Sequence, residues 1–301
     1  MKTRMIYNCP NLECKSTTKN GLTVKDGFYF RRDDSRKIQR YVCKKCKKKF
    51  SKATFSLERH HKKRRVNYRL FRLMTTPCSM NRAARELHIN YKTVQRKMEY
   101  LAKKSKIKQA QFIKKLERNK VISMQFDDLI TIEHTKMKPL SITLAVDKKT
   151  RYILGAKVST IPAFGLIADK SRKKYGPRRN NHSQNLDKLF KNISKSIAPN
   201  ALIESDEHQA YPKYIRKYFP NATHHSFRSI RGSNTGQGEL KKVRFDPLFT
   251  INHTFAMLRG HINRLVRKTW CTTKKIDMLQ NHVDIYILFY NFYYLKKSYP
   301  H

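Results

Sequence analysis

Four of the six cysteines fall into two close pairs, and this spacing constrains the N-terminal fold more than any other feature. The pairs are C-x4-C, at Cys9 and Cys14, and C-x2-C, at Cys43 and Cys46. Two such turns supply the four thiolates that tetrahedral Zn²⁺ prefers. Two disulfides in a secreted domain are the alternative, but the residues before Cys9 lack the apolar segment of a secretory signal. The spacing predicts a zinc ribbon over residues 1–56, with a β-hairpin between the two pairs.

The chain carries a large excess of positive charge, with 67 Lys and Arg against 21 Asp and Glu and a formal net charge of +46. Such a chain attracts polyanions. Nucleic acid is the first candidate, because neutralising phosphates releases counterions. A membrane surface is the alternative, but no uninterrupted apolar stretch is long enough to span a bilayer. We therefore expect a nucleic-acid partner and no membrane.

Residues 57–106 have the phasing of a helix-turn-helix. Leu87 and Ile89 bracket a tight turn, His88 stands within it, and Asn90 is placed to cap the second helix. The side chains expected to project outward into a DNA groove are Tyr91, Lys92, Thr93, Gln95 and Arg96. An ordinary helical hairpin is the alternative, but the basic outward face favours DNA binding.

After a basic linker helix over residues 107–119, the pattern changes to that of an α/β domain. Three β-rich segments joined by polar turns predict an antiparallel meander over Val121–Ile132, Leu140–Val146 and Arg151–Val158. A helix, a strand, a second helix and a fifth strand follow, over 186–197, 201–205, 208–218 and 222–227. This order is that of an RNase H-like α/β core. Two long helices close the chain.

Two acidic residues lie where such a core does chemistry. A carboxylate in the first strand and one after the fourth strand lie side by side there, and together they can hold two Mg²⁺ ions. The first strand contains Asp127 and Asp128, and we prefer Asp127 because it shares a polar face with Ser123 and Gln125. Asp206 ends the fourth strand, although it could instead cap the following helix.

The motifs that carry a family resemblance are Gln125–Asp128, Ser205–Pro212, Asn252–Arg259 and Arg264–Cys271. Their order, after the cysteine pairs and the helix-turn-helix, resembles that of small bacterial insertion-sequence transposases. Those enzymes have a zinc ribbon, a helix-turn-helix and a DDE-type, RNase H-like catalytic domain, which here would span residues 120–301. The resemblance implies hydrolysis of a phosphodiester at transposon ends, followed by attack of the freed 3′-OH on target DNA. It also implies catalytic Mg²⁺ or Mn²⁺, double-stranded DNA partners, a homodimer or higher oligomer on DNA, and a bacterial cytoplasmic, nucleoid-associated location.

By this resemblance, Asp127 and Asp206 are the first two acids of the catalytic triad. The third position departs from the pattern, because Asn252 stands where the family has Glu. An amide oxygen can ligate Mg²⁺, but more weakly than a carboxylate does. Glu239, in a Gly-rich loop, is the alternative third ligand.

Two basic loops, over residues 169–179 and 228–244, are expected to contact DNA phosphates. The candidate residues are Arg178, Arg179 and Lys241, together with Arg259 on the helix that carries Asn252. Three functions stay open at this point. They are an active DDE-type transposase, a catalytically inactive relative that keeps DNA binding, and a non-enzymatic zinc-ribbon and helix-turn-helix regulator. Wide separation of Asp127 from Asp206 would exclude the first two.

Overall fold

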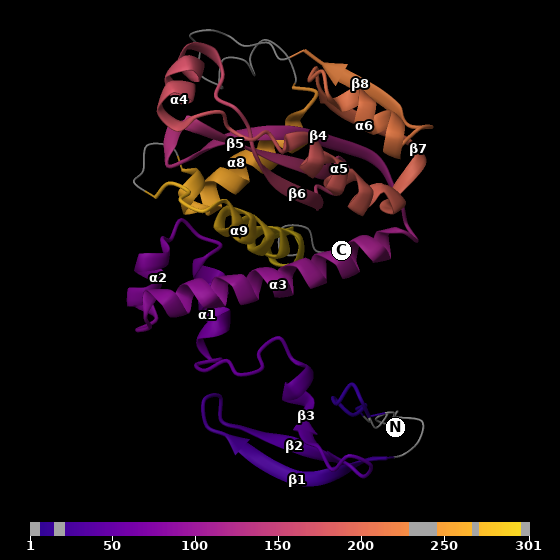
Figure 1. The fold of residues 1–301 in the computed structure, drawn as a ribbon. Coiled ribbons are helices and arrows are strands. Elements are labelled where there is room, and N and C mark those ends of the chain that lie inside the picture. Colours follow the sequence, from indigo (N-terminus) through magenta and orange to yellow (C-terminus); the bar gives the residue numbers. More distant parts are fainter. Residues whose placement is uncertain (1–6, 15–21, 229–245, 267–270, 296–301) are drawn as a thin grey trace. The chain divides into compact units, whose positions relative to one another are not determined.

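A computed structural model of the chain describes residues 7–14, 22–228, 246–266 and 271–295 (Figure 1). The chain forms two compact units, residues 1–70 and residues 71–301, and the division falls within helix α1 (Val66–Leu73). The predicted domain boundaries at residues 56 and 119 stay predictions. The predicted boundary at residue 106 lies inside α3 (Tyr91–Leu116), a single continuous helix of 26 residues.

Unit 1 contains a three-stranded antiparallel sheet in the order β1-β2-β3. Its strands are β1 (Thr23–Arg31), β2 (Arg36–Cys43) and β3 (Lys49–Ser51). Four aromatic rings pack against one another with centroid distances of 5.4 to 5.9 Å, namely those of Tyr7, Tyr41, Phe50 and Phe55. This small cluster gives the sheet an apolar base, but a unit of this size has little core of its own.

After the end of α1, unit 2 continues with two helices, α2 (Met80–Glu86) and α3, that are joined by a tight turn. Asn90 caps α3, because its Oδ1 accepts a hydrogen bond of 2.8 Å from the Lys92 N–H. His88 adopts a left-handed conformation in the turn, with φ 49°. Leu87 and Val94 are buried, and the assignment of this helix pair as a DNA-binding helix-turn-helix stays a prediction.

A five-stranded sheet follows, in the order β6-β5-β4-β7-β8. Its strands are β4 (Val121–Glu133), β5 (Thr135–Asp147), β6 (Ile153–Thr160), β7 (Ile197–Asp206) and β8 (Thr223–Phe227). β4, β5 and β6 form the predicted antiparallel meander, whereas β7 and β8 pair in parallel with β4 and β7. This mixed α/β architecture, with β4 at the centre, is consistent with an RNase H-like core.

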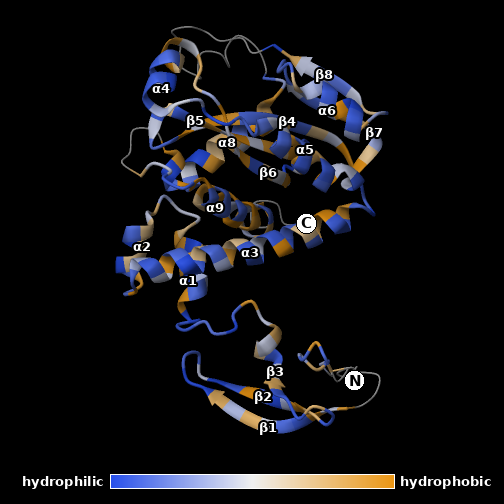
Figure 2. Cartoon of the chain, viewed as in Figure 1, coloured by the Kyte–Doolittle hydropathy of each residue, from blue (hydrophilic) through white to orange (hydrophobic). Residues whose placement is uncertain are grey.

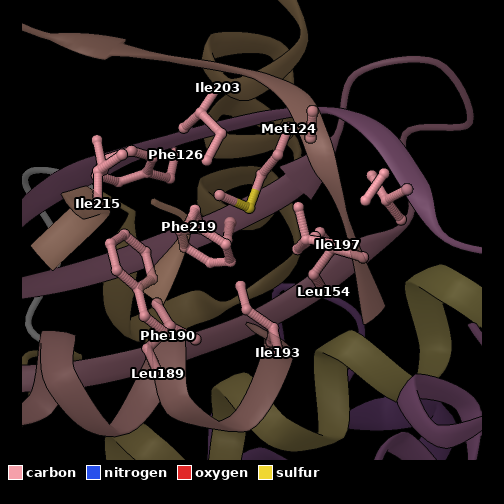
Figure 3. Close-up of a cluster of buried hydrophobic side chains, with 14 of the residues drawn as sticks. Met124, Phe126, Leu154, Leu189, Phe190, Ile193, Ile197, Ile203, Ile215 and Phe219 are labelled. Atoms are coloured by element: carbon pink, nitrogen blue, oxygen red, sulfur yellow. The ribbon is translucent and has the colours of Figure 1, made fainter. Parts of the chain in front are cut away.

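One face of the sheet is covered by α5 (His182–Ile193) and α6 (Tyr211–Tyr218). Met124 and Phe126 of β4 are fully buried there, against Phe190 of α5 (Figure 3). Figure 2 shows the matching hydropathy pattern, with apolar residues along β5 and β7 and a strongly hydrophilic α4 (Ala168–Tyr175). Side chains alternate along a strand, so Gln125 and Asp127 must point to the opposite face.

That opposite face of β4 contacts the segment that starts α8 (Phe249–His261). The Gln125 side chain donates to the Pro247 carbonyl at 2.8 Å and accepts from the Ile251 N–H at 3.1 Å. Helix α9 (Ile276–Phe289) packs along α3 and β6. Among the described residues, no helix combines the length and apolar character needed to cross a membrane.

Candidate functional site

The four paired cysteines of unit 1, which we call the thiol cluster, come together in space. Their sulfur atoms all lie within 4.8 Å of one another, and no disulfide links them. The Sγ atoms of Cys9 and Cys46 are 3.4 Å apart, and those of Cys14 and Cys43 are 3.8 Å apart. Sulfurs bound tetrahedrally at about 2.3 Å lie about 3.8 Å from one another. The thiol cluster therefore has the donor set and the spacing to bind a metal ion.

Local backbone hydrogen bonds shape the two turns of the thiol cluster. The Cys14 N–H donates to the Asn11 carbonyl at 3.1 Å, and the Cys43 N–H donates to the Lys48 carbonyl at 3.0 Å. Burial and hydrogen bonds from the other three thiols raise the pKa of Cys9 to about 12, against the effect of the Asn11 backbone. A metal ion must displace that proton, so its affinity increases with pH.

In unit 2, Asp127 and Asp206 lie on neighbouring parallel strands at the centre of the sheet. Gln125 of β4 pairs in register with Glu204 of β7, and the two aspartates each stand two residues further along. Residues two apart on a strand share a face. Both carboxylates therefore point to the same face, and the structure brings the two predicted acids together.

The electrostatics of Asp127 reflect this arrangement. Burial, followed by the negative charge of Asp206, raises the pKa of Asp127 to about 7. Asp128 and Asp246 contribute in the same direction, whereas the hydrogen bond from the Asp128 backbone N–H opposes the shift. A buried carboxylate beside other negative charges is stabilised by a divalent cation, and oxygen donors suit Mg²⁺ or Mn²⁺.

Asp246 is a member of this site that the sequence interpretation missed. It precedes α8, and its Oδ1 accepts from the Leu248 N–H at 2.9 Å. Its Oδ2 accepts from the Asn252 side-chain amide at 2.8 Å. Asn252, the predicted third ligand, therefore hydrogen-bonds to an acid. An Asp before Pro in an acid-poor chain was the available signal, but this pair is also typical of a helix start. We call Asp127, Asp206 and Asp246 the acid cluster.

A buried polar network supports the acid cluster from the N-terminal side of the strands. Glu204 is 4% exposed and accepts from the Gln125 amide at 2.8 Å and from Lys148 Nζ at 2.7 Å. Because Gln125 also holds the Pro247 carbonyl, β4, β7 and the start of α8 are tied together beside the acid cluster. A buried network with its partners satisfied fixes the local geometry.

Asp128, the competing choice on β4, points to the opposite face, toward α5 and α6. Its carboxylate accepts hydrogen bonds from Ser141, Thr143, His182 and Tyr211. Burial acts to raise its pKa, but the hydrogen bond and charge of His182, with the two hydroxyls of β5, outweigh it and lower the pKa to about 2. Asp128 does not face the acid cluster.

The predicted DNA-contacting residues differ in their surroundings. Tyr91, Lys92 and Arg96 are exposed on α3, while Thr93 and Gln95 are partly buried. Arg178 is only 15% exposed, and its Nη2 lies 2.7 Å from Glu133 Oε2, so an acid of the same unit holds its charge. Arg179 is exposed and Arg259 partly buried. Glu239 and Lys241 lie outside the described residues.

Comparisons with known proteins add little. No family model matches the sequence. No curated protein matches it. Among solved structures, the chain aligns with one described as "Crystal structure of the Mos1 Strand Transfer Complex", at 9% identity and a TM-score of 0.25, over 74% of this chain and 75% of that one. At that TM-score, the likeness identifies neither the fold nor the function of this chain.

Proposed function

We propose that this protein is a DDE-type DNA transposase that binds insertion-sequence ends and performs metal-dependent hydrolysis and strand transfer. One observation carries the proposal. Asp127 and Asp206 share a face on adjacent parallel strands, and the charge of Asp206 raises the pKa of Asp127. The sequence order of zinc ribbon, helix-turn-helix and RNase H-like core supports it. So does the net charge of +46, which suits a DNA partner.

In this proposal, Asp127, Asp206 and Asp246 hold divalent cations, and Asn252 orients Asp246 through its amide. Bound cations supply activation of the attacking oxygen and stabilisation of the leaving oxygen. The protein's own residues hold the metal-binding carboxylates in position. Gln125 and Glu204 hold the strands and the start of α8, and Asn252 directs one oxygen of Asp246. This arrangement explains how the chain can carry an amide where the resembling family has Glu.

The thiol cluster is proposed to hold one structural Zn²⁺, because four thiolates at this spacing suit a tetrahedral site with no open position. The exposed side chains at the start of α3, with Lys92 and Arg96 the most basic, are proposed to enter a DNA groove. In both proposals these residues have structural or DNA-binding roles, and phosphodiester cleavage takes place at the acid cluster.

Cleavage of native flanking DNA tests the function. A supercoiled plasmid should carry the DNA that borders the coding sequence in its genome, and nicking should be measured with Mg²⁺, Mn²⁺ or EDTA. We expect metal-dependent nicks at defined positions that are absent with Asp127→Asn or Asp206→Asn. The control is Asp187→Asn, which removes a surface acid 2.6 Å from Lys217 Nζ. Nicking that survives Asp127→Asn would refute the proposal.

The second candidate is a catalytically inactive relative that keeps DNA binding, and Asn252 at the family's acidic position favours it. This candidate predicts sequence-specific binding to the same flanking DNA without any nick, whichever divalent cation is present. Specific binding without cleavage by a wild-type protein that binds Mn²⁺ would favour it over an active enzyme.

A further inference from the structure

Behind the acid cluster, on the opposite face of β4, lies a buried polar group that the proposed chemistry does not use. We call it the Asp128 network. The Asp128 carboxylate accepts hydrogen bonds of 2.5 to 2.7 Å from donors on three other elements, namely Ser141 and Thr143 of β5, His182 of α5 and Tyr211 of α6. One side chain therefore joins β4 to a neighbouring strand and to both helices that cover this face.

The network is not a catalytic triad. A triad needs the acid on one imidazole nitrogen and the nucleophile on the other. Here the same atom, His182 Nε2, lies 2.6 Å from Asp128 Oδ2 and 3.4 Å from Thr143 Oγ1. The ring therefore cannot relay a proton between those two groups. Ser141, Thr143, His182 and Tyr211 are all buried as well, which leaves no room for a substrate.

Stability alone is also a weak reason for such a group. Burying a carboxylate and an imidazole costs desolvation energy, and well-packed apolar residues often serve equally well. The surroundings here are apolar and aromatic. The Tyr211 ring centroid lies 4.6 Å from that of Phe126, and Phe126 lies 5.0 Å from Phe190. A carboxylate that requires four donors in such a place fixes geometry in a way that an apolar side chain cannot.

Two covalent connections link the network to the acid cluster. Asp127 is the next residue along β4, and its Oδ1 accepts a 2.6 Å hydrogen bond from the Asp128 N–H. Tyr211 begins α6, five residues after Asp206, and its backbone N–H donates to the His208 carbonyl at 3.1 Å in the intervening turn. The Tyr211–Asp128 bond thus ties the strand that carries Asp127 to the turn that follows Asp206.

We propose that the Asp128 network positions the acid cluster from behind, by setting the spacing between the Asp127 and Asp206 carboxylates. Asp128, His182 and Tyr211 are positioning residues in this inference, because they act through the backbone and contact no metal or DNA. The inference rests on the proposed function, since it assumes that these two carboxylates share divalent cations. It predicts that cation affinity depends on hydrogen bonds made on the far side of the sheet.

The test removes single donors and measures Mn²⁺ binding by calorimetry, beside the Mg²⁺ concentration that half-saturates nicking. Tyr211→Phe keeps the ring and deletes the hydroxyl. We expect a roughly 10-fold or greater loss of Mn²⁺ affinity, a matching rise in half-saturating Mg²⁺, and unchanged DNA binding. Tyr214→Phe on the same helix is the matched control, and it should resemble wild type.

A second pair of variants separates positioning from folding. His182→Gln keeps an amide that can donate to Asp128, whereas His182→Leu keeps bulk and no donor. We expect the Gln variant to retain more Mn²⁺ affinity than the Leu variant. If either variant fails to fold, Ser141→Ala removes one of the four donors with the least loss of volume. It should weaken Mn²⁺ binding in a folded protein.

The outcomes distinguish failure of this inference from failure of the proposed function on which it rests. If Tyr211→Phe, His182→Leu and Ser141→Ala lower the melting temperature but leave Mn²⁺ affinity at the wild-type value, the network is only structural and the inference is overturned. Loss of Mn²⁺ binding in Asp127→Asn would keep the proposed function intact in that case. If the wild-type protein binds no Mn²⁺ and cuts no DNA, the proposed function and this inference both fall.

Discussion

The thiol cluster and the acid cluster each bring together side chains that can bind a metal ion once deprotonated, but the fold forms the two clusters in different ways. The thiols sit on two tight turns, one before β1 and one between β2 and β3, in a unit with little apolar core. The carboxylates sit on two central strands and a helix start, within a sheet whose other face is packed with apolar side chains. In our proposal, unit 1 has too small a core to stay folded without a Zn²⁺ ion bound at the thiol cluster. Unit 2 has an apolar core of its own, so the divalent cations that we propose for the acid cluster need not hold that unit together.

Removal of the metal from unit 1 should produce the largest effect. Chelation, or Cys43→Ser, should unfold residues 22–56 with a loss of about 10 kcal/mol of metal-binding free energy, and leave unit 2 folded. Hydrogen exchange resolved by segment measures this effect, and elemental analysis should find about one Zn²⁺ per chain. Cys271→Ser is the control, because this thiol lies outside the thiol cluster. Full protection of β1 and β2 in chelated protein would remove the contrast between the two sites.

Asp127→Asn should give the complementary result. Because unit 2 does not depend on its ions for folding, the variant should stay folded, while DNA cleavage falls by about 10³-fold or more, which is about 4 kcal/mol in barrier height. DNA binding should be kept or become tighter, since a negative charge that repels phosphate is lost. Cleavage kinetics with matched binding curves measure both effects. A variant that unfolds instead would mean that the acid cluster, like the thiol cluster, is needed for its unit to fold.

The pH dependence of stability should sharpen the comparison. The pKa of Asp127 is raised to about 7 in the folded chain, so between pH 4 and pH 7 the native state holds a proton that the unfolded state has released. The free energy of unfolding of metal-free protein should therefore decrease as pH rises through this window, by up to about 4 kcal/mol. Asp127→Asn should lack this decrease, and Mg²⁺ should reduce it. Denaturant titrations of both proteins at several pH values measure the difference, and parallel curves would contradict the assigned pKa.

The smallest expected effect separates Asp246 from Asn252 as the third ligand. Asp246→Asn should weaken Mg²⁺ affinity about 10- to 100-fold, whereas Asn252→Ala, which only frees Asp246, should weaken it less. Calorimetry with Mn²⁺ and half-saturating Mg²⁺ in the nicking assay report both values. Asn252→Asp should keep or raise the affinity if this position also contacts an ion. A larger loss from Asn252→Ala than from Asp246→Asn would restore the amide as the third ligand.

Local patterns in the sequence were enough to predict much of this arrangement. Alternation along β4 separated the faces of Asp127 and Asp128, and the order of strands and helices predicted the mixed sheet. Asn90 was recognisable as a cap, because an Asn side chain can accept from the backbone two residues on. Each of these features depends on neighbours within a few residues of one another.

What could not be predicted depends on contacts between distant segments. Asp246 joins the acid cluster because the Gln125 side chain holds the carbonyl of Pro247, 122 residues away along the chain. The partners of Asp128 come from three elements, so its position among apolar neighbours had no explanation in the sequence of β4 alone. Arg178 pairs with Glu133 across 45 residues, whereas its own loop suggested a residue free to meet phosphate.

The continuity of α3 has a mechanical consequence. Its 26 residues form a rod about 39 Å long at 1.5 Å per residue, and its first two turns carry the exposed side chains of Lys92 and Arg96. Near the other end, the Gln109 amide donates to the Ile153 carbonyl of β6 at 2.9 Å, which anchors the rod to the sheet. Each inserted residue would advance the far end by about 1.5 Å and rotate it by about 100°. The number of residues between the anchored end of α3 and its first turn therefore sets the direction in which that first turn faces.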